Sequence, residues 1–324
     1  MHYFYDAPQA ALAFLVNQAY TINARVYEQK YPDLDFGRLV YVDESAPEWT
    51  PGVTTFMSST VGKAEWVDGA AKDVPNAELL RDRSDIKVHM AAIGYEYNVE
   101  ELGQAQLLVA TGGPGLTDAK AAGARRGYVE FMWNVTIAGD TTKGLLGLSN
   151  QTNVTIGTAP ADGTGSVSTW FDAGGNITKT PAQIVRDINS VLTGVFVGTN
   201  TIEMADTILL PHDVYAWLAS TTMSATNSET VLSFILRTNI YTMRTGQQLT
   251  IRGELGLSTA GTGGTRRMVA YANREDVVKL HLPMRHRFMA PREEGSFGFK
   301  VPGMFRTGGV EVLRTGAFRY LDGI

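Results

Sequence analysis

The segment from Val53 to Gly139 constrains the fold of this chain more than any other. Two arms of alternating polar and apolar residues flank a charged connection, and a long amphipathic stretch then ends at Gly139. Alternation with a period of two predicts strands, so the arms predict a β-hairpin. An isolated two-stranded hairpin is marginally stable in water, and this one is too polar to bury itself. We therefore expect it to need a partner, which indicates assembly; the alternative is an ordinary exposed loop of a monomer.

The two arms differ in how regular they are. The first, Val53–Val61, is rich in Thr and Val. In the returning arm, polar residues alternate with Ile86, Val88 and Met90. After Met90 the apolar phase slips by one residue, as a β-bulge requires, and the inward positions pass to Ile93, Tyr95 and Tyr97. The connection 67–84 is expected to form a charged tip, with Gly69 and Pro75 as turn residues.

Composition restricts the class of protein. A chain of 324 residues that is 44% hydrophobic can bury a substantial core, which we expect to be split over two subdomains. The 28 Lys and Arg against 33 Asp and Glu give a net charge of −5, which argues against a whole surface that binds nucleic acid, although one face could still contact it. With no cysteine, stability must come from packing or oligomer contacts, which suits folding in the cytoplasm. Asp6 before an apolar run predicts a helix start and not an export signal.

Helix signals are clear in the middle of the chain. A helix is expected over Val99–Ala110, and a second one from an N-cap at Thr117 to Gly139, about six turns long. The Gly112–Gly115 break between them lacks the Gly-Lys-Ser and G-x-G-x-x-G patterns of phosphate loops. Thr180-Pro181-Ala182-Gln183 predicts a capping box before an apolar stripe, Ile184, Ile188, Val191, Leu192 and Val195. A buried strand at 207–210, a short helix after Pro211 and another helix near 229–237 follow.

Strand patterns return in the last sixty residues. They are expected at 268–272, 279–282, 297–301, 310–313 and 318–321. This long antiparallel region rejoins the early helix, so the sequence predicts a discontinuous domain into which the middle third is inserted.

The chain carries little catalytic chemistry. His281 and His286 are five residues apart, which is not a helical ligand spacing, and no carboxylate stands near them in the sequence. His212-Asp213 has no nucleophile elbow beside it, and the pair is expected to start a helix. Adjacent carboxylates such as those at 100–101 and 293–294 point apart and cannot act as an acid/base couple. We therefore expect no enzyme activity, no cofactor and no metal site.

At this point the order of elements resembles the major capsid proteins of tailed double-stranded DNA phages with the Hong Kong 97-type fold. The resemblance covers nearly the whole chain. It is carried by the hairpin 53–97, the helix segment 119–126 continuing to Gly139-Asp140, Gly144–Leu148, Ala205–Pro211, and the ending 308–312 through 320–324. Arg314-Thr315 departs from the Arg-Pro that the family often has near its last strand.

The resemblance implies an α+β fold with an N-terminal arm, an extended β-hairpin loop, a peripheral domain with a long spine helix, and an inserted axial α/β domain. On this basis the expected divisions are the arm and start of the peripheral domain (1–52), the extended loop (53–97), the peripheral domain (98–143), the axial domain (144–268) and the returning peripheral strands (269–324). The expected intersubunit residues in the loop and tip are Lys63, Glu65, Trp66, Asp68, Lys72, Glu78, Arg81 and Arg83. The spine helix core is expected at Tyr128, Phe131, Met132 and Val135.

The implied function is structural. Pentamers and hexamers of the chain would close an icosahedral shell around double-stranded DNA contacted without sequence reading, in a virion whose subunits fold in the host cytoplasm. A portal protein at one vertex and possible cement and scaffolding proteins are the implied partners, and no membrane is involved. Some members of the family join subunits covalently; Lys63 lies in the corresponding loop, but no asparagine partner is identifiable, so a noncovalent shell is expected. The alternatives are the shell of an encapsulin-type nanocompartment, which has the same fold, and, more remotely, a soluble α/β enzyme.

Overall fold

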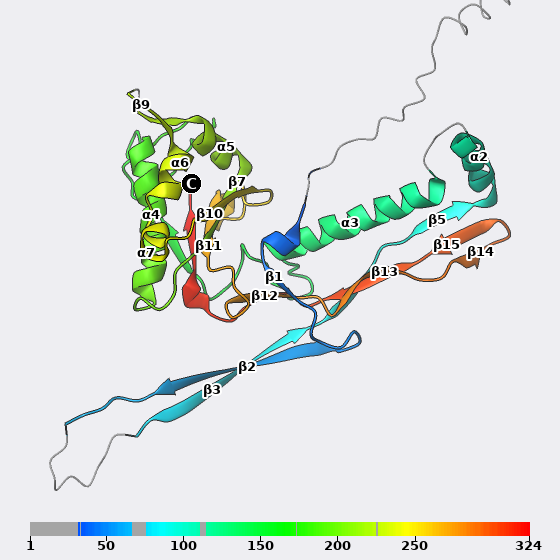
Figure 1. Ribbon diagram of the computed structural model, residues 1–324, viewed down its shortest axis with the longest axis horizontal. Coiled ribbons are helices and arrows are strands. Elements are labelled where there is room, and N and C mark those ends of the chain that lie inside the picture. The colour runs from blue at the N-terminus through cyan, green and yellow to red at the C-terminus, as the bar shows by residue number, and fades with distance from the viewer. Residues whose placement is uncertain (1–31, 33, 67–75, 111–114, 173, 225) are drawn as a thin grey trace, which may run out of the picture. The chain divides into compact units, whose positions relative to one another are not determined.

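The computed structural model describes residues 32, 34–66, 76–110, 115–172, 174–224 and 226–324. Helices and strands are mixed throughout this part of the chain, so the expected α+β class is confirmed (Figure 1). The chain forms two compact units, each made of separated segments. The first includes Ile93–Arg126 and Phe288–Gly303, and the second consists of Leu34–Ala92, Gly127–Arg287 and Met304–Ile324. The helix start expected at Asp6 and most of the Gly112–Gly115 break lie outside the described residues.

The first unit is built on a small antiparallel sheet in the order β14–β15–β5. Its elements are β5 (Tyr95–Asn98), α2 (Val99–Ala110), the start of α3 (Leu116–Ala138), β14 (Arg292–Glu294) and β15 (Gly298–Val301). Tyr97 and Phe299 are directly opposed in the sheet, and their rings stack with centroids 5.5 Å apart. Helix α2 has the predicted bounds because Asn98 caps it: the Asn98 side chain accepts a hydrogen bond of 2.6 Å from the backbone N–H of Glu101.

The second unit contains a five-stranded sheet in the order β10–β7–β11–β18–β6. Its strands are β6 (Thr155–Thr158), β7 (Thr207–Pro211), β10 (Thr250–Glu254), β11 (Arg267–Tyr271) and β18 (Phe318–Asp322). The expected boundary after residue 268 falls inside β11, and β18 pairs with both β11 and β6. The C-terminal strand therefore belongs to the sheet of the middle third. From the sequence it was expected to lie with the returning peripheral strands instead. Alternation identifies a strand, but backbone hydrogen bonds across the sheet decide its neighbours.

Helices pack on this sheet and form a hydrophobic core with it (Figure 1). They are α4 (Pro181–Gly198), α5 (His212–Ser220), α6 (Val231–Arg237) and α7 (Ile240–Thr245). The capping box of α4 is confirmed, because Thr180 and Gln183 bond each other's backbone N–H groups, and all five residues of the predicted apolar stripe are buried. Helix α6 begins at Val231 and not near Glu229, because Glu229 belongs to the short hairpin β8–β9 (Thr222–Ser224 and Asn227–Thr230).

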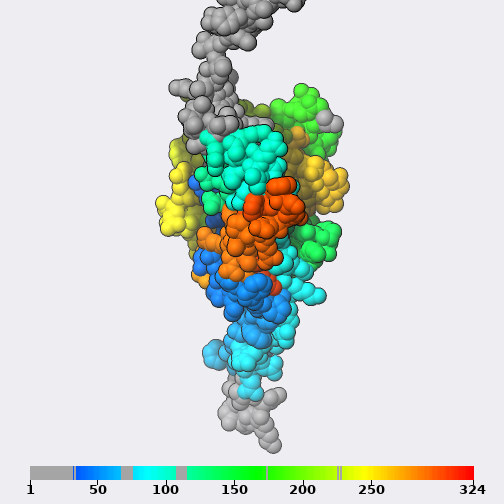
Figure 2. Space-filling view, turned by 90° about the vertical axis from the view of Figure 1, so that its right-hand side faces the viewer, coloured from blue at the N-terminus to red at the C-terminus, as the bar shows by residue number. Residues whose placement is uncertain are grey.

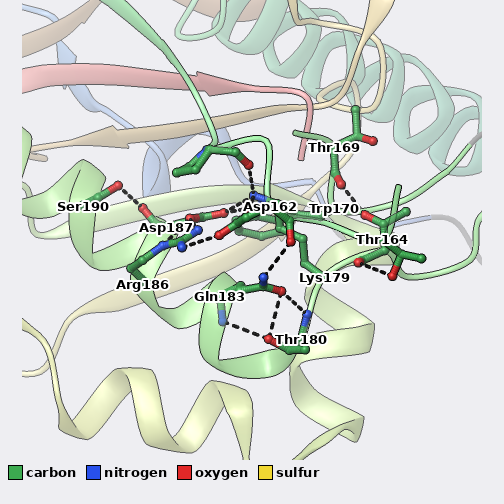
Figure 3. A network of polar contacts seen from close by, with 12 residues as sticks. Asp162, Thr164, Thr169, Trp170, Lys179, Thr180, Gln183, Arg186, Asp187 and Ser190 are labelled. Atoms are coloured by element: carbon green, nitrogen blue, oxygen red, sulfur yellow. Dashed lines mark hydrogen bonds and ion pairs between the residues drawn. The ribbon is translucent and has the colours of Figure 1, made fainter. Parts of the chain in front are cut away.

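A buried polar network holds the connection between β6 and α4 (Figure 3). Lys179 has no exposed side-chain surface; its Nζ lies 2.8 Å from Asp187 Oδ2 and 3.2 Å from Asp162 Oδ1. Trp170 Nε1 donates to the same Asp187 oxygen at 3.0 Å, and Arg186 binds the other oxygen at 2.5 Å. Since charges removed from water must be paired, this network fixes the path of a connection that has little regular structure.

The second half of α3 lies in the second unit and ends where the sequence predicts. Gly139 has φ +70°, and a Cβ there would lie 2.4 Å from the carbonyl oxygen of Leu145, so only glycine fits this turn. The start of the helix is different from the prediction, because α3 begins at Leu116 and the expected N-cap, Thr117, is already helical. Helix ends fray by one or two residues, and this difference is of that size.

Two three-stranded sheets complete the second unit together with a long hairpin. Their orders are β1–β12–β17 and β13–β16–β4, and the hairpin is β2–β3. The strands are β1 (Tyr41–Asp43), β2 (Gly52–Val61), β3 (Glu78–Lys87), β4 (His89–Ala92), β12 (Val278–His281), β13 (Met284–Phe288), β16 (Gly303–Thr307) and β17 (Gly309–Val312). Eight short strands, each of five residues or fewer, are not among those that the sequence predicts: β1, β6, β8, β9, β10, β13, β14 and β16.

Candidate assembly interface

The predicted hairpin is confirmed as two ten-residue strands in continuous antiparallel register. Gly52 pairs with Lys87 at the base, and Val61 pairs with Glu78 at the far end. The expected tip is therefore too long, because residues 78–84 belong to strand β3 and only the connection 62–77 lies between the arms. Asp, Glu and Arg have weak strand propensity, but cross-strand pairing with the Thr- and Val-rich first arm outweighs it.

The phase slip in the returning arm occurs one step earlier than predicted. Val88 is buried, His89 is half-buried and Met90 is 61% exposed, so the alternation changes between the end of β3 and the start of β4. Met90 is thus not an inward residue. From Ile93 to Tyr97 the odd-numbered positions are the less exposed ones, as predicted. The backbone N–H of Val88 donates to the carbonyl of Pro51 (3.0 Å) and so continues the hairpin register by one pair, whereas His89 pairs with Thr307 of β16. The phase therefore changes where the arm changes its partner strand.

A buried carboxylate anchors the base of the hairpin to the sheet β1–β12–β17. Glu311 on β17 accepts a hydrogen bond from Thr55 Oγ1 (3.0 Å) through Oε2, and His281 Nε2 lies 2.8 Å from the same oxygen. Both Glu311 and His281 are almost fully buried, and His281 Nδ1 lies 3.7 Å from Asp43 Oδ2. Burial acts to raise the pKa of Glu311, but hydrogen bonds from His281, Ser84 and Thr55 outweigh it, so the pKa lies below its ordinary value. The carboxylate therefore stays charged and holds both arms at their base.

A groove of about 470 Å³ opens beside this anchor. It is lined by the base of β3, the turn after α3 and strand β17, including Lys87, Lys143, Gly308 and Glu311. Gly308 lies so close to Ile86 and His281 that a Cβ there would come within 3.1 Å of the isoleucine methyl group. The base of the hairpin is thus closely packed against its own subunit.

The outer half of the hairpin has no such support. Phe56 is 73% exposed, and Val61, Leu79 and Leu80 are each 55% exposed. In the space-filling view the two arms, coloured blue and cyan, lie side by side as a narrow projection (Figure 2). Large apolar side chains are thus exposed on both faces of the strand pair, which is typical of a segment that binds another protein.

The intersubunit residues expected in the loop and tip are mostly exposed. Lys63 and Glu65 form a weak ion pair of 3.9 Å beyond the end of β2, and Trp66 is fully exposed. Glu78, Arg81 and Arg83 are exposed on β3, where Arg83 also binds Asp85 (2.7 Å). Asp68 and Lys72 lie outside the described residues. The described residues of this set are therefore accessible to a neighbouring subunit. That they contact one stays a prediction.

Three of the four residues expected in the spine helix core are at least partly buried. Met132 and Val135 are buried, and Tyr128 packs edge-on against Phe305 with ring centroids 4.8 Å apart. Phe131 packs edge-on against Phe305 with ring centroids 5.4 Å apart, yet it is 40% exposed, so its core assignment is wrong in the subunit alone. Along a helix of this length the apolar positions drift slowly around the helix axis, so some residues that fit the apolar pattern face away from the core.

The sequence missed the anchor because its members are far apart in the chain. His281 was expected to have no carboxylate nearby, yet Asp43 and Glu311 flank it. His286 instead stacks on Tyr128, with ring centroids 5.3 Å apart. In the sequence, Glu311 stands between the apolar residues of strand β17. A single carboxylate in an otherwise apolar strand is the one sequence signal that could have indicated a buried ion pair.

The expected helix start at His212-Asp213 is confirmed, and Asp213 pairs with Arg266 (2.7 Å). Within the described residues, no group of three or more His, Asp or Glu side chains is placed to hold a metal ion. Of the described helices, none is both long and apolar enough to span a bilayer.

Comparison with known proteins agrees with this architecture. The model of the major capsid protein family matches residues 62–324. No curated protein matches the chain. Among solved structures, the capsid of Myoviridae Phage XM1 is 18% identical, with a TM-score of 0.75 over 95% of this chain and 98% of that one. The capsid of a native GTA particle is 12% identical (TM-score 0.59; 96% and 98% covered), and a protein of Mycobacterium phage Bobi is 13% identical (TM-score 0.58; 98% of each chain).

At these identities the structural likeness shows the fold alone, whereas the family match covers most of the chain. Neither favours the nanocompartment shell, and a family of capsid proteins points to a structural role and not to a soluble enzyme. The long hairpin, the spine helix and the order of the elements are those expected from the sequence. The chain therefore belongs to the major capsid protein family, with the Hong Kong 97-type fold of tailed phage capsids.

Proposed function

We propose that copies of this chain assemble as pentamers and hexamers into a closed icosahedral phage head, and that the hairpin β2–β3 extends over a neighbouring subunit. The observation that carries this proposal is the outer half of the hairpin, which is regular, apolar in part and unsupported by its own subunit. Interfaces between subunits that exist only in assemblies bury on the order of 2,000 Å² or more. A hairpin of this length can contribute a large share of such an area.

The proposed domain organisation follows the expected one with one change. The hairpin with the residues up to 97 is the extended loop, and α3 with the antiparallel strands around it is the peripheral domain. The axial domain takes the five-stranded sheet with helices α4 to α7, including the C-terminal strand β18. In the assembled head this domain would gather around the five-fold and six-fold axes.

The direct test is negative-stain electron microscopy of the chain expressed alone, with light scattering to measure mass. Closed or partly closed shells, or discrete pentamers and hexamers, support the proposal. A monodisperse monomer over a range of salt and protein concentrations contradicts it.

A shortened hairpin tests the role of the arms more specifically. Thr55 and Ser84 are directly opposed, so residues 56–83 can be replaced by an Asn-Gly turn while the base and its Glu311 anchor are kept. We expect a folded subunit with an unchanged melting temperature that forms no normal shells. Shells like those of the unmodified chain would contradict the assigned role.

The enclosed molecule is proposed to be double-stranded DNA, contacted without sequence reading. The net charge of −5 argues against a wall that holds phosphates tightly. A portal protein at one vertex would complete the particle, and cement and scaffolding proteins are the further partners that the family resemblance implies. Purified particles should contain DNA that interacts weakly with the wall, and a strong, salt-sensitive affinity of empty shells for DNA would contradict this part of the proposal.

A further inference from the structure

The hairpin β2–β3 has two chemically different faces. Opposed residues of antiparallel strands point to the same face, and successive residues point to opposite faces, so the register assigns every side chain. One face carries Val53, Thr55, Met57, Ser59 and Val61 of β2 with Glu78, Leu80, Asp82, Ser84 and Ile86 of β3. The other carries Gly52, Thr54, Phe56, Ser58 and Thr60 with Leu79, Arg81, Arg83, Asp85 and Lys87.

Charge is segregated between these faces. The first has two carboxylates, Glu78 and Asp82, and no basic side chain; we call it the acidic face. The second has Arg81, Arg83 and Lys87 against the single carboxylate of Asp85, and we call it the basic face. Asp85 is bound by Arg83 at 2.7 Å, so the remaining charge of this face is positive.

The acidic face is the one by which the hairpin already lies on its own subunit. At the base, Thr55 bonds Glu311, and Ile86 lies beside Gly308. Along β2 the side chains of this face are half-buried as far as Met57, whereas Thr54 and Phe56 on the basic face are exposed. The acidic face therefore points toward the body of the subunit.

Beyond Met57 the same face continues without support. Leu80 lies on it between the carboxylates of Glu78 and Asp82, and Val61 lies directly opposite Glu78; both apolar side chains are 55% exposed. The strand pair twists along its length, but only four residues of β2 follow Met57, so its outer half still turns this face toward the surface that comes next. In a shell built of copies of one chain, that surface belongs to another copy.

We propose that the acidic face of the outer hairpin lies on a second copy of this chain, against arginine or lysine side chains that surround apolar residues there, and that the basic face points away from it. This deepens the proposed function and rests on it. Apolar contact through Val61 and Leu80 supplies the attraction, and the two carboxylates select a basic surface and disfavour an acidic one. The hairpin is thus attached on one side only.

Leu79 and Leu80 form a matched pair for the test. They are neighbours in the chain, equally exposed, and on opposite faces. We expect Leu80→Lys to reduce the yield of shells at least tenfold, because it places a positive charge in a basic interface and removes apolar contact. Leu79→Lys should assemble like the unmodified chain. Light scattering and electron microscopy at matched protein concentration measure the yield, and circular dichroism confirms that both subunits are folded.

A second pair tests the charge alone. Asp82→Lys should block assembly. Arg81→Glu should not, because on this proposal Arg81 and Arg83 point away from the neighbouring copy, which revises the expectation that they contact it. Equal effects of the two variants within either pair, or a larger effect on the basic face, overturn the inference. If the unmodified chain forms no shells, the proposed function fails, and this inference fails with it.

Discussion

Replacing Lys179 by methionine should destabilise the second unit by about 3 kcal/mol. The side chain is completely buried, and its ammonium group binds Asp187 at 2.8 Å, Asp162 at 3.2 Å and the carbonyl of Pro160 at 2.8 Å (Figure 3). Removing one partner of a buried ion pair costs about 3–5 kcal/mol, because the other charge is left without compensation. Arg186 still binds Asp187, so the low end of this range applies. For a large domain this loss lowers the melting temperature by roughly 6 °C or more.

Urea and thermal unfolding followed by tryptophan fluorescence measure this change, since Trp170 donates a hydrogen bond to Asp187 and reports on the network. Lys143→Met is the control; this lysine is exposed, and its replacement should cost less than about 0.5 kcal/mol. In the double variant Lys179→Met/Asp187→Asn the uncompensated charge is gone, and we expect at least about 1 kcal/mol to be recovered. A loss below about 1 kcal/mol in the single variant, or no recovery in the double one, would refute the argument.

Three further perturbations test other parts of the structure. Glu311→Gln should lower the free energy of unfolding by about 1 kcal/mol at pH 7, because hydrogen bonds to a charged acceptor are stronger than those to a neutral one. Folding lowers the pKa of Glu311, so this contribution is present above the unfolded pKa of about 4.3 and is lost as the pH falls below it. Urea unfolding of both proteins at pH 7 and at pH 3 would show the difference. The hydrogen bond from Arg186 lowers the pKa of Asp162 to about 2. The melting temperatures of Asp162→Asn and the unmodified chain should therefore differ above about pH 4 and converge as the pH falls to 2. A difference that stays constant with pH would contradict this. Gly139→Ala should cost about 2 kcal/mol or more, since it adds a backbone clash to the strain of positive φ, whereas Gly144→Ala, with φ +69° and open space around it, should cost only about 1 kcal/mol; equal melting temperatures of the two variants would argue against the clash.

Local sequence signals predict local structure well in this chain. Thr180 and Pro181 start α4 as predicted, because a cap and a first-turn proline act within four residues of each other. Gly139 ends α3 for an equally local reason, the left-handed conformation that glycine permits. The alternation of Val53–Val61 gives a strand, and its returning partner follows from the matching pattern around Ile86. The resemblance to the capsid family rests on the order of such elements.

Features that depend on contacts between distant segments were not predictable in the same way. Strand β18 joins β11 and β6 through backbone hydrogen bonds that no side-chain pattern specifies. The arm changes phase between Val88 and His89 because its partner changes there from β2 to β16, where His89 pairs with Thr307. Phe131 fits the apolar stripe of α3, yet it is 40% exposed, because the side chains that could cover it come from distant segments such as β16, which contributes Phe305.

The sequence by itself determined the long hairpin, the spine helix and the absence of a recognisable catalytic motif, because these follow from periodicity, capping residues and the spacing of side chains within short segments. Only the tertiary structure decided how the hairpin is held and which way it faces. Thr55 and Glu311 are more than 200 residues apart in the chain, and they meet with His281 only when β2, β12 and β17 come together. The cost of burying the Glu311 carboxylate requires those partners, and their positions direct the acidic face of the hairpin toward its own subunit.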